Sequence, residues 1–284
     1  MKNTLRRALS LMITSVLALT LAGCGASAEG SSRLDQIKKR GVLTVATEPY
    51  FAPNEFIDPS KSGNEQYVGS DIELAELIAE RIGVKLELVP LEFTQVLASV
   101  AEGKYDLAIS ALAWTPERNE AMELSVGYNF REDSDGYGLL VKEDKLGVIN
   151  GPDDLADCII VTQSASIQET LANEQIPAYK EFKKVSSMTD AFLSVQEGKA
   201  DAAIVASKNA QLYIDANPDA KMAVVPEFRF TVDEKYGGTR IGAPKGETEL
   251  IEAVNGVLKE VNENGQYKAW YDEYTEYAKE LGIE

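Results

Sequence analysis

A sequence repeat at a fixed offset limits the folds open to this chain more than any other feature. Residues 97–109 (LASVAEGKYDLAI) match residues 192–204 (FLSVQEGKADAAI), with a separation of 95 residues at every matched position. Each copy has the pattern of a helix, a Gly-Lys turn and a strand that enters a sheet. At the same offset Asp71 corresponds to Ser166, and both stand at predicted helix starts. The repeat predicts two similar lobes, each built on its own mostly parallel sheet.

Short apolar strands alternate with amphipathic helices along the rest of the chain, which indicates an α/β architecture. Strands are predicted over 42–46, 84–89, 106–110, 159–161, 202–205 and 222–225, and helices over 70–82, 93–101, 247–262 and 266–281. Residues 70–73 form a capping-box pattern at the start of the first helix. The aromatic residues of the last helix are expected to pack in the core. Ligands of open parallel sheets bind beyond the carboxyl ends of the strands, so two facing lobes predict one cleft between them.

The first residues have the pattern of an export signal. Three basic residues precede an apolar run over 8–22, which is too short for a transmembrane helix and fits the core of a signal peptide. Residues 21–24 (LAGC) look like a bacterial lipobox, which predicts a signal peptide over 1–23 and a lipid anchor (diacylglycerol, palmitate) on Cys24. Residues 24–33 then form a small, polar tether to the membrane. A secretory signal followed by a chance cysteine is the alternative.

Charge and residue counts exclude several classes of function. The chain carries 46 acidic and 28 basic residues, and loss of residues 1–23 with their three basic residues leaves a net charge of −21. Such a charge argues against binding to nucleic acid or to an anionic membrane surface. Cys158 is the one cysteine left beside Cys24; it is expected to be buried, and no disulfide is expected. The absence of histidine excludes Ser-His and Cys-His catalysis and the commonest ligand of transition metals, so no metal or cofactor is predicted.

Several short motifs in order carry a family resemblance. They are residues 48–56, 67–72, 102–104, 115–118 and 161–169. With these motifs the chain resembles, over residues 34–282, the polar-amino-acid solute-binding proteins of bacterial ABC importers. The resemblance implies a type II periplasmic-binding-protein fold and a monomer that is not an enzyme. It also implies an amino acid or amino-acid-like ligand, ABC permease subunits as partners, and a lipid-anchored location outside the cytoplasmic membrane, at the cell surface or in the periplasm.

Two helix starts are the candidate anion site. Thr115 and Pro116 look like an N-cap followed by proline at the first helical position, which places Arg118 in the first turn. A guanidinium there can hold a carboxylate through two parallel hydrogen bonds. The resemblance assigns the ligand's α-carboxylate to Arg118 and, from the second lobe, to Ser166 at its own helix start. A solvated arginine and a plain N-cap are the alternatives.

Three more residues are placed at the ligand by the resemblance, and Trp114 is a candidate because it lies four residues before Arg118. Phe51 and Phe93 correspond to aromatic residues that stack on the ligand's side chain, although both could instead belong to the core. Glu48 corresponds to a position that contacts the ligand's distal group, where a carboxyl favours a cationic end such as that of arginine, lysine or histidine. A solvated loop glutamate is the alternative. Trp114 either packs against the ligand or is wholly structural.

Three alanines occupy candidate site positions. The family commonly holds the ligand's α-ammonium with an aspartate where this chain has Ala206 and a hydroxyl where it has Ala113. Ala111 is placed in the same site. A buried ammonium without acceptors costs ~1–3 kcal/mol or more. Another group such as Glu48 takes the amine, the amine lies elsewhere, or the ligand is not an ordinary α-amino acid.

The expected mechanism is ligand binding followed by closure of the lobes. The first lobe is predicted over 34–130 plus 237–284 and the second over 131–236, with crossings near 130–138 and 234–238. A dehydratase-like enzyme on the same fold is one alternative, and it requires a general acid in the cleft. A freestanding sensory protein for a carboxylate without a standard α-amine is another.

Overall fold

The computed structural model describes residues 31–130 and 136–283, and residues 33–284 form one compact unit. The predicted signal peptide and Cys24 lie outside the described residues. The helices are α2 (Arg33–Arg40), α3 (Ser70–Ile82), α4 (Phe93–Ala101), α5 (Pro116–Ala121), α6 (Ile167–Gln175), α7 (Met188–Gln196), α8 (Ser207–Ala216), α9 (Thr248–Glu263) and α10 (Gln266–Leu281). The strands are β1 (Val42–Thr47), β2 (Phe56–Ile57), β3 (Tyr67–Val68), β4 (Lys85–Pro90), β5 (Leu107–Ala113), β6 (Met122–Leu124), β7 (Tyr137–Lys142), β8 (Ile159–Gln163), β9 (Glu181–Val185), β10 (Ala202–Ala206), β11 (Met222–Val224) and β12 (Thr239–Pro244).

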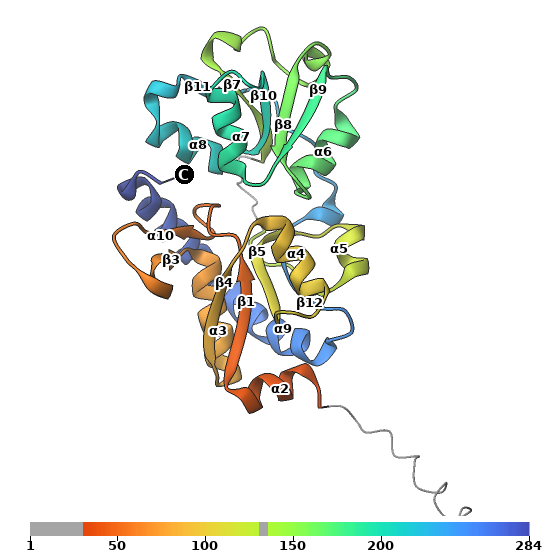
Figure 1. Ribbon diagram of the computed structural model, residues 1–284, viewed down its shortest axis with the longest axis vertical. Helices are drawn as coiled ribbons and strands as arrows, with labels where there is room; N and C mark the ends of the chain where they lie inside the picture. Colours follow the sequence, from red (N-terminus) through yellow and green to blue (C-terminus); the bar gives the residue numbers. More distant parts are fainter. Residues whose placement is uncertain (1–30, 131–135, 284) are drawn as a thin grey trace, which may run out of the picture. The chain divides into compact units, whose positions relative to one another are not determined.

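Two five-stranded sheets confirm the predicted α/β architecture. The first has the order β4-β1-β5-β12-β6 and the second the order β11-β7-β10-β8-β9. In the first sheet β4, β1 and β5 are parallel, and β12 is antiparallel to both β5 and β6. In the second sheet β9, β8 and β10 are parallel, and β7 is antiparallel to β10 and β11. Each sheet therefore has three parallel strands at one side and antiparallel pairing at the other, with its helices on both faces (Figure 1).

The chain passes between the sheets twice. Strands β1 to β6 are followed by β7 to β11 in the second sheet, and β12 returns to the first. The two passages lie side by side, because Tyr128 and Thr239 exchange backbone hydrogen bonds of 2.9 and 2.7 Å. We call the elements around the first sheet lobe 1 and those around the second sheet lobe 2. The lobe boundaries expected near residues 130 and 236 stay a prediction, since residues 131–135 are not described.

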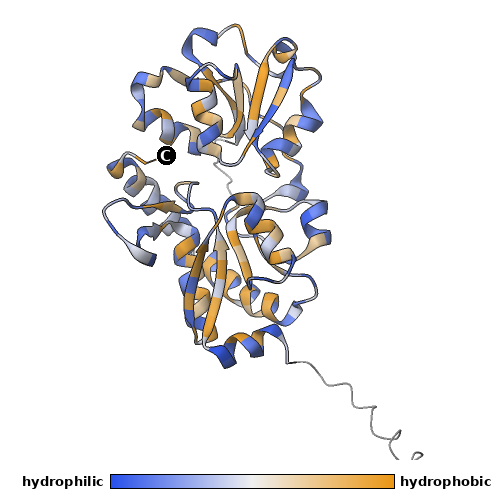
Figure 2. Ribbon diagram, in the orientation of Figure 1, coloured by the Kyte–Doolittle hydropathy of each residue, from blue (hydrophilic) through white to orange (hydrophobic). Residues whose placement is uncertain are grey.

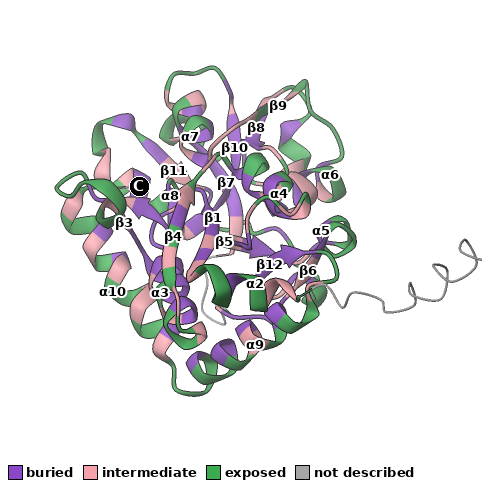
Figure 3. Cartoon of the chain, turned by 60° about the horizontal axis from the view of Figure 1, so that its bottom comes forward, coloured by how far each residue is buried: buried purple, intermediate pink, exposed green. Residues whose placement is uncertain are grey.

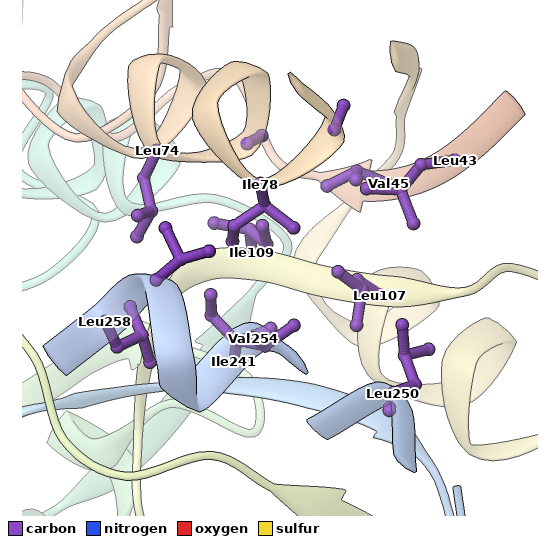
Figure 4. Packing of buried hydrophobic residues seen from close by; sticks show 14 of the residues in the cluster. Leu43, Val45, Leu74, Ile78, Leu107, Ile109, Ile241, Leu250, Val254 and Leu258 are labelled. Atoms are coloured by element: carbon purple, nitrogen blue, oxygen red, sulfur yellow. The ribbon is translucent and has the colours of Figure 1, made fainter. Parts of the chain in front are cut away.

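Alternation along the strands decides which helix covers which face. In β5, Leu107 and Ile109 belong to the cluster with α3 and α9, whereas Ala108 and Leu112 belong to the cluster with α4. Figure 4 shows side chains of α3 and α9 converging on Ile109 from two sides. Burial of one such aliphatic side chain contributes roughly 1.5–3 kcal/mol. Figure 2 shows strands that are largely hydrophobic and helices that have one hydrophobic and one hydrophilic side. Figure 3 shows that most strands are buried between the helices.

The repeat in the sequence is a repeat in the structure. Helix α4 and helix α7 begin and end at positions 95 residues apart, and β5 and β10 begin at the same offset. Gly103 and Gly198 form the turns between them, with φ of 76° and 71°. A left-handed φ of this kind suits glycine because glycine has no Cβ. The predicted helix–turn–strand unit is therefore confirmed in both lobes.

The start of α3 differs from the prediction. The N-cap is Gly69, with φ 134° and no side-chain capping bond, so the capping box predicted over 70–73 is wrong. A Cβ on Gly69 would lie 2.1 Å from the backbone oxygen of Asn54, and this close approach requires glycine. The Ser70 and Asp71 side chains instead form long-range hydrogen bonds with the hydroxyl of Tyr267 in α10.

An apolar cluster links helices from the two lobes. Leu212 of α8 is buried in a cluster with Ala278 of α10 and with Ala52, Phe56 and Val68 of lobe 1. The rings of Tyr274 and Tyr277 in α10 pack on Phe56 in the same cluster. The aromatic residues of α10 thus lie in packed positions, as predicted. Cys158, by contrast, is partly exposed rather than buried.

Candidate functional site

A cavity of about 280 Å³ is lined by residues of both lobes at the ends of their parallel strands. Eight of the nine predicted ligand-binding residues line it: Glu48, Phe51, Phe93, Ala111, Ala113, Arg118, Ser166 and Ala206. Trp114 is not among the lining residues and packs against the ring of Tyr236 at a centroid distance of 6.3 Å. The cavity has the size expected for a small ligand such as an amino acid.

Arg118 is fixed at the cavity by its helix start and by both lobes. The Thr115 hydroxyl accepts a hydrogen bond from the Arg118 backbone N–H and Pro116 follows it, as the N-cap pattern predicted. The guanidinium donates to the Ala113 carbonyl and, across the lobes, to the Ala165 carbonyl, each at 2.7 Å. Because a guanidinium has five N–H groups, donors remain for a ligand after these two bonds.

The surroundings of Arg118 favour an anion. The side chain is buried with no acidic partner among the ion pairs of the described residues. Burial lowers the pKa of Arg118 to about 10, so the group stays charged at neutral pH. The Phe93 ring lies against it, with the guanidinium carbon 5.3 Å from the ring centroid. An unpaired buried cation gains most from an anionic ligand.

Ser166 is the N-cap of α6, and its first turn faces the cavity. The Ser166 hydroxyl accepts from the Glu169 backbone N–H at 3.2 Å and donates to the Gln163 carbonyl at 2.7 Å. Ser166, Ile167 and Gln168 all line the cavity. The first backbone N–H groups of a helix have no intrahelical acceptor, and the helix dipole adds positive potential there. Ser166 itself is therefore committed to capping, while the turn that follows it is available to an anion.

Glu48 follows β1 directly and is 3% exposed. Its Oε1 accepts a hydrogen bond of 2.7 Å from the Gln163 amide, so the end of β1 meets the end of β8. Burial raises the pKa of Glu48 to about 8, with smaller contributions from the charges of Glu92 and Asp190. A buried carboxyl with this pKa holds a proton at neutral pH unless a cation approaches it.

The aromatic and alanine positions shape the cavity. Phe51 packs partly on the lobe 2 core, and Phe93 is 7% exposed at the start of α4. Ala111 has a left-handed φ of 46°, and its N–H donates to Asp71 Oδ2 at 2.8 Å. Ala113 and Ala206 present no polar side chain, and the Ala113 carbonyl already accepts from Arg118. Neither alanine supplies a side-chain acceptor for an amine.

Other polar residues that line the cavity were not singled out from the sequence, among them Glu55, Gln163 and Asn129. Glu55 is 1% exposed and its carboxyl forms a side-chain hydrogen bond with Asp71. The Nδ2 of Asn129, a residue with φ 50°, is buried without a partner. Gln163 lay inside the motif at residues 161–169. Glu55 lay inside the motif at residues 48–56, whereas Asn129 lay in none of the motifs.

Two classes of feature do not occur in the described part of the chain. Within residues 31–130 and 136–283, no three or more His, Cys, Asp or Glu side chains are grouped in a way that could hold a metal ion. No helix of the same residues has the length and apolar content needed to cross a bilayer.

Two lobes, a double crossing and a cavity at the ends of their parallel strands are typical of two-lobed solute-binding proteins. Residues 43–277 match the model of the bacterial extracellular solute-binding proteins, family 3. The chain belongs to this family.

Similar proteins agree with that assignment. The arginine-binding extracellular protein ArtP of Bacillus subtilis is 27% identical over 273 residues, covering 94% of this chain and 98% of ArtP. The amino acid ABC transporter substrate-binding protein AbpA of Streptococcus pneumoniae, solved with L-arginine bound, is 32% identical with a TM-score of 0.76, covering 88% of this chain and 99% of AbpA. This likeness confirms the type II periplasmic-binding-protein fold. The cyclohexadienyl dehydratase of Pseudomonas aeruginosa is 25% identical over 224 residues, covering 79% of this chain and 81% of the enzyme.

Proposed function

We propose that the chain binds a cationic amino acid, with arginine the first candidate, and delivers it to an ABC importer. One observation carries the proposal: an unpaired guanidinium (Arg118) and an uncompensated carboxyl (Glu48) line the same cavity. A ligand with a carboxylate and a distal cation would compensate both. The arginine-binding relatives support this ligand class.

At the carboxylate end, Arg118 and the first turn of α6 act together. The remaining N–H groups of Arg118 would bind both carboxylate oxygens, and the N–H groups after Ser166 would bind from lobe 2. Because the two donors belong to different lobes, the ligand would stabilise the arrangement in which both reach it. Closure around the ligand is therefore part of the proposal.

At the distal end, Glu48 would accept from the cation. The approach of a positive charge lowers the pKa of a neighbouring carboxyl, so Glu48 would lose its proton on binding. Phe51 would cover the apolar part of the side chain. With Ala113 and Ala206 lacking acceptors, the α-amine would contribute little to the affinity.

The experiment is calorimetric titration of the chain lacking residues 1–24, refolded to remove bound ligand. L-arginine is expected to bind tightly, and its derivative without the α-amine is expected to bind nearly as well. Agmatine, which lacks the carboxylate, should bind weakly because Arg118 loses its partner. If neither arginine nor lysine binds while a carboxylate without a cationic end does, the ligand class is wrong.

We further propose that the protein is lipid-anchored through Cys24 outside the cytoplasmic membrane. The lipobox-like residues 21–24 support this location. Radiolabelled palmitate should be incorporated into the full chain and not into a Cys24→Ala variant, which should appear in the soluble extracytoplasmic fraction. Labelling that survives the substitution would contradict the anchor.

A dehydratase is the second candidate, because Glu48 has the property of a general acid. Its carboxyl holds a proton at neutral pH inside the cavity, and one relative is named as a cyclohexadienyl dehydratase. Incubation with prephenate-like acids separates the two functions. Turnover that Glu48→Gln abolishes would establish the enzyme, whereas one-to-one arginine binding without turnover would support the importer.

A further inference from the structure

Asp71 has the position in lobe 1 that Ser166 has in lobe 2, but its side chain does not cap its helix. The Ser166 hydroxyl accepts from the Glu169 backbone N–H at the start of α6. Asp71 stands in the first turn of α3, whose N-cap is Gly69 without a side-chain capping bond. Asp71 is 0% exposed, and a buried carboxyl needs hydrogen-bond donors. These donors come from other segments of the chain.

The first of these segments forms the wall of the cavity. Ala111 lines the cavity, and its backbone N–H donates to Asp71 Oδ2 at 2.8 Å. The φ of Ala111 is 46°, a left-handed conformation that is unfavourable for a residue with a Cβ. The hydrogen bond to Asp71 therefore helps to hold Ala111 in this conformation. Glu55, another lining residue, forms a side-chain hydrogen bond with Asp71 as well.

The second segment is the first passage between the lobes. The hydroxyl of the buried Tyr128 donates to Asp71 Oδ2 at 3.0 Å. The Tyr128 backbone exchanges hydrogen bonds with Thr239 of the return passage, and Thr239 Oγ1 donates to the Tyr128 carbonyl at 3.0 Å. Thr239 lines the cavity, and so does Asn129, the residue after Tyr128. Tyr128 thus ties both passages to Asp71 directly beside the cavity.

The third segment is α10. The Tyr267 hydroxyl donates to Asp71 Oδ1 at 2.6 Å, and the Tyr267 ring packs against the Tyr128 ring at a centroid distance of 4.9 Å. Helix α10 also contacts α3 of lobe 1 and α8 of lobe 2. Neither Asp71 nor Tyr128 lines the cavity itself. Both therefore act on a ligand only through the groups that they hold in place.

We propose that Asp71 is a positioning residue for ligand binding, which fixes the cavity wall at Ala111 and the two passages at Tyr128 in one arrangement. The inference rests on the proposed function and adds a residue that controls the affinity without touching the ligand. A buried carboxylate that accepts several hydrogen bonds stabilises one geometry of its donors. When one of these bonds is lost, the passages can adopt other arrangements. The apparent affinity then falls with the fraction of molecules that are ready to bind.

The test compares Tyr128→Phe with Tyr274→Phe in the chain lacking residues 1–24. Tyr274 is a matched control, because its hydroxyl also donates to a carboxyl of α3, Glu73 Oε1, at 2.6 Å, and neither residue lines the cavity. Calorimetry measures the dissociation constant for L-arginine. Tyr128→Phe should weaken binding by about 5- to 10-fold, because a hydrogen bond to a buried carboxylate is lost. Tyr274→Phe should leave the constant unchanged, although urea denaturation should show a loss of stability in both variants.

Asp71→Asn tests the carboxyl itself. The side chain keeps its shape but has an NH₂ group in place of one acceptor oxygen, so one of the donors loses its partner. It should weaken arginine binding at least as much as Tyr128→Phe does. If Asp71→Asn does not fold, the two tyrosine variants decide, because each loses only a hydroxyl.

Small-angle X-ray scattering gives a measurement that needs no ligand. The radius of gyration of ligand-free Tyr128→Phe should exceed that of the unaltered chain, and saturating arginine should make the two equal. If arginine binds to Tyr128→Phe as tightly as to the unaltered chain, Asp71 has no positioning role and the proposed function stands. If the unaltered chain binds no arginine, the proposed function fails and the ligand-free radii alone decide. A larger radius then supports the inference, and an equal radius overturns it.

Discussion

The two copies of the repeated unit have the same framework and different continuations. In lobe 1, β5 continues to Ala113 through the left-handed Ala111, and the chain then reaches α5 and Arg118. In lobe 2, β10 ends at Ala206 and α8 begins at the next residue. The two lobes therefore share the helix–turn–strand unit of the repeat. Arg118 comes from the segment after β5, which has no equivalent after β10.

The ends of β1 and β8, which meet across the lobes, also carry different groups. Glu48 follows β1 with a carboxyl, and Gln163 ends β8 with an amide that donates to it. Lobe 1 thus supplies Arg118 and Glu48, whereas Gln163 and the start of α6 in lobe 2 supply neutral donors; Asp233 and Glu234, next to the return passage, also line the cavity. Under the proposed function, Arg118 and Glu48 of lobe 1 would bind the charged groups of the ligand.

The largest effect is expected from removal of the charge that has no lobe 2 counterpart. Arg118→Ala should weaken arginine binding by at least ~100-fold, because it removes a buried bidentate partner worth ~3–5 kcal/mol. Calorimetry measures the loss, and Arg81→Ala, at an exposed ion pair with Glu260, is the control. If the variant kept its affinity for arginine, the start of α6 in lobe 2 would bind the carboxylate without Arg118 of lobe 1.

Glu48 should make stability depend on pH, whereas its counterpart Gln163 cannot titrate. Burial raises the pKa of Glu48 in the folded protein from its ordinary value of 4.5 to about 8, so between these pH values the folded state binds one more proton than the unfolded state. This stabilisation is complete below pH 4.5 and is lost as pH rises through 8. The loss amounts to roughly 3 kcal/mol between about pH 5 and 8. Urea denaturation of the ligand-free chain checks it, and Glu48→Gln should flatten the profile; an unchanged slope would contradict the assigned pKa.

Asp106 and Asp201 occupy matched positions with unequal partners. Asp106 bonds to Arg33, Arg40 and Thr44, whereas Asp201 accepts from the Ile159 N–H. Asp106→Asn should therefore cost about 3 kcal/mol of unfolding free energy and Asp201→Asn about 1 kcal/mol. Urea denaturation of both variants measures the difference. Equal losses would show that the arginines add nothing to the lobe 1 copy.

The smallest effect is expected at the two turns, where the copies agree. Gly103→Ala and Gly198→Ala should each cost about 1–2 kcal/mol, because alanine is strained at positive φ. A Cβ at Gly198 meets nothing within 4 Å and one at Gly103 only an Arg33 nitrogen at 3.6 Å, so sterics should not separate them. Equal losses of unfolding free energy in the two variants would support the equivalence of the two turns. A difference well above 1 kcal/mol between them would contradict it.

The sequence predicted the helices and helix starts that depend on local residue patterns. Helix α10 was predicted with its observed bounds, and the Thr115–Pro116 start placed Arg118 correctly at the cavity. The start of α3 was mispredicted because Ser70 and Asp71 satisfy partners about 200 residues away rather than the local backbone. Glu55 lay inside the motif at residues 48–56 but was not singled out, since its contact with Ser110 spans 55 residues. Such contacts leave no periodic trace in a single sequence.

The packing of Leu212 against α10 bears on how long a ligand stays bound. Leu212 of α8 and Ala278 of α10 are buried in one apolar cluster, so under the proposed closure this packing would add to the stability of the closed arrangement. The residence time would then depend on how often α8 separates from α10. Under the proposed function, the importer would promote release of the ligand by separating these two helices.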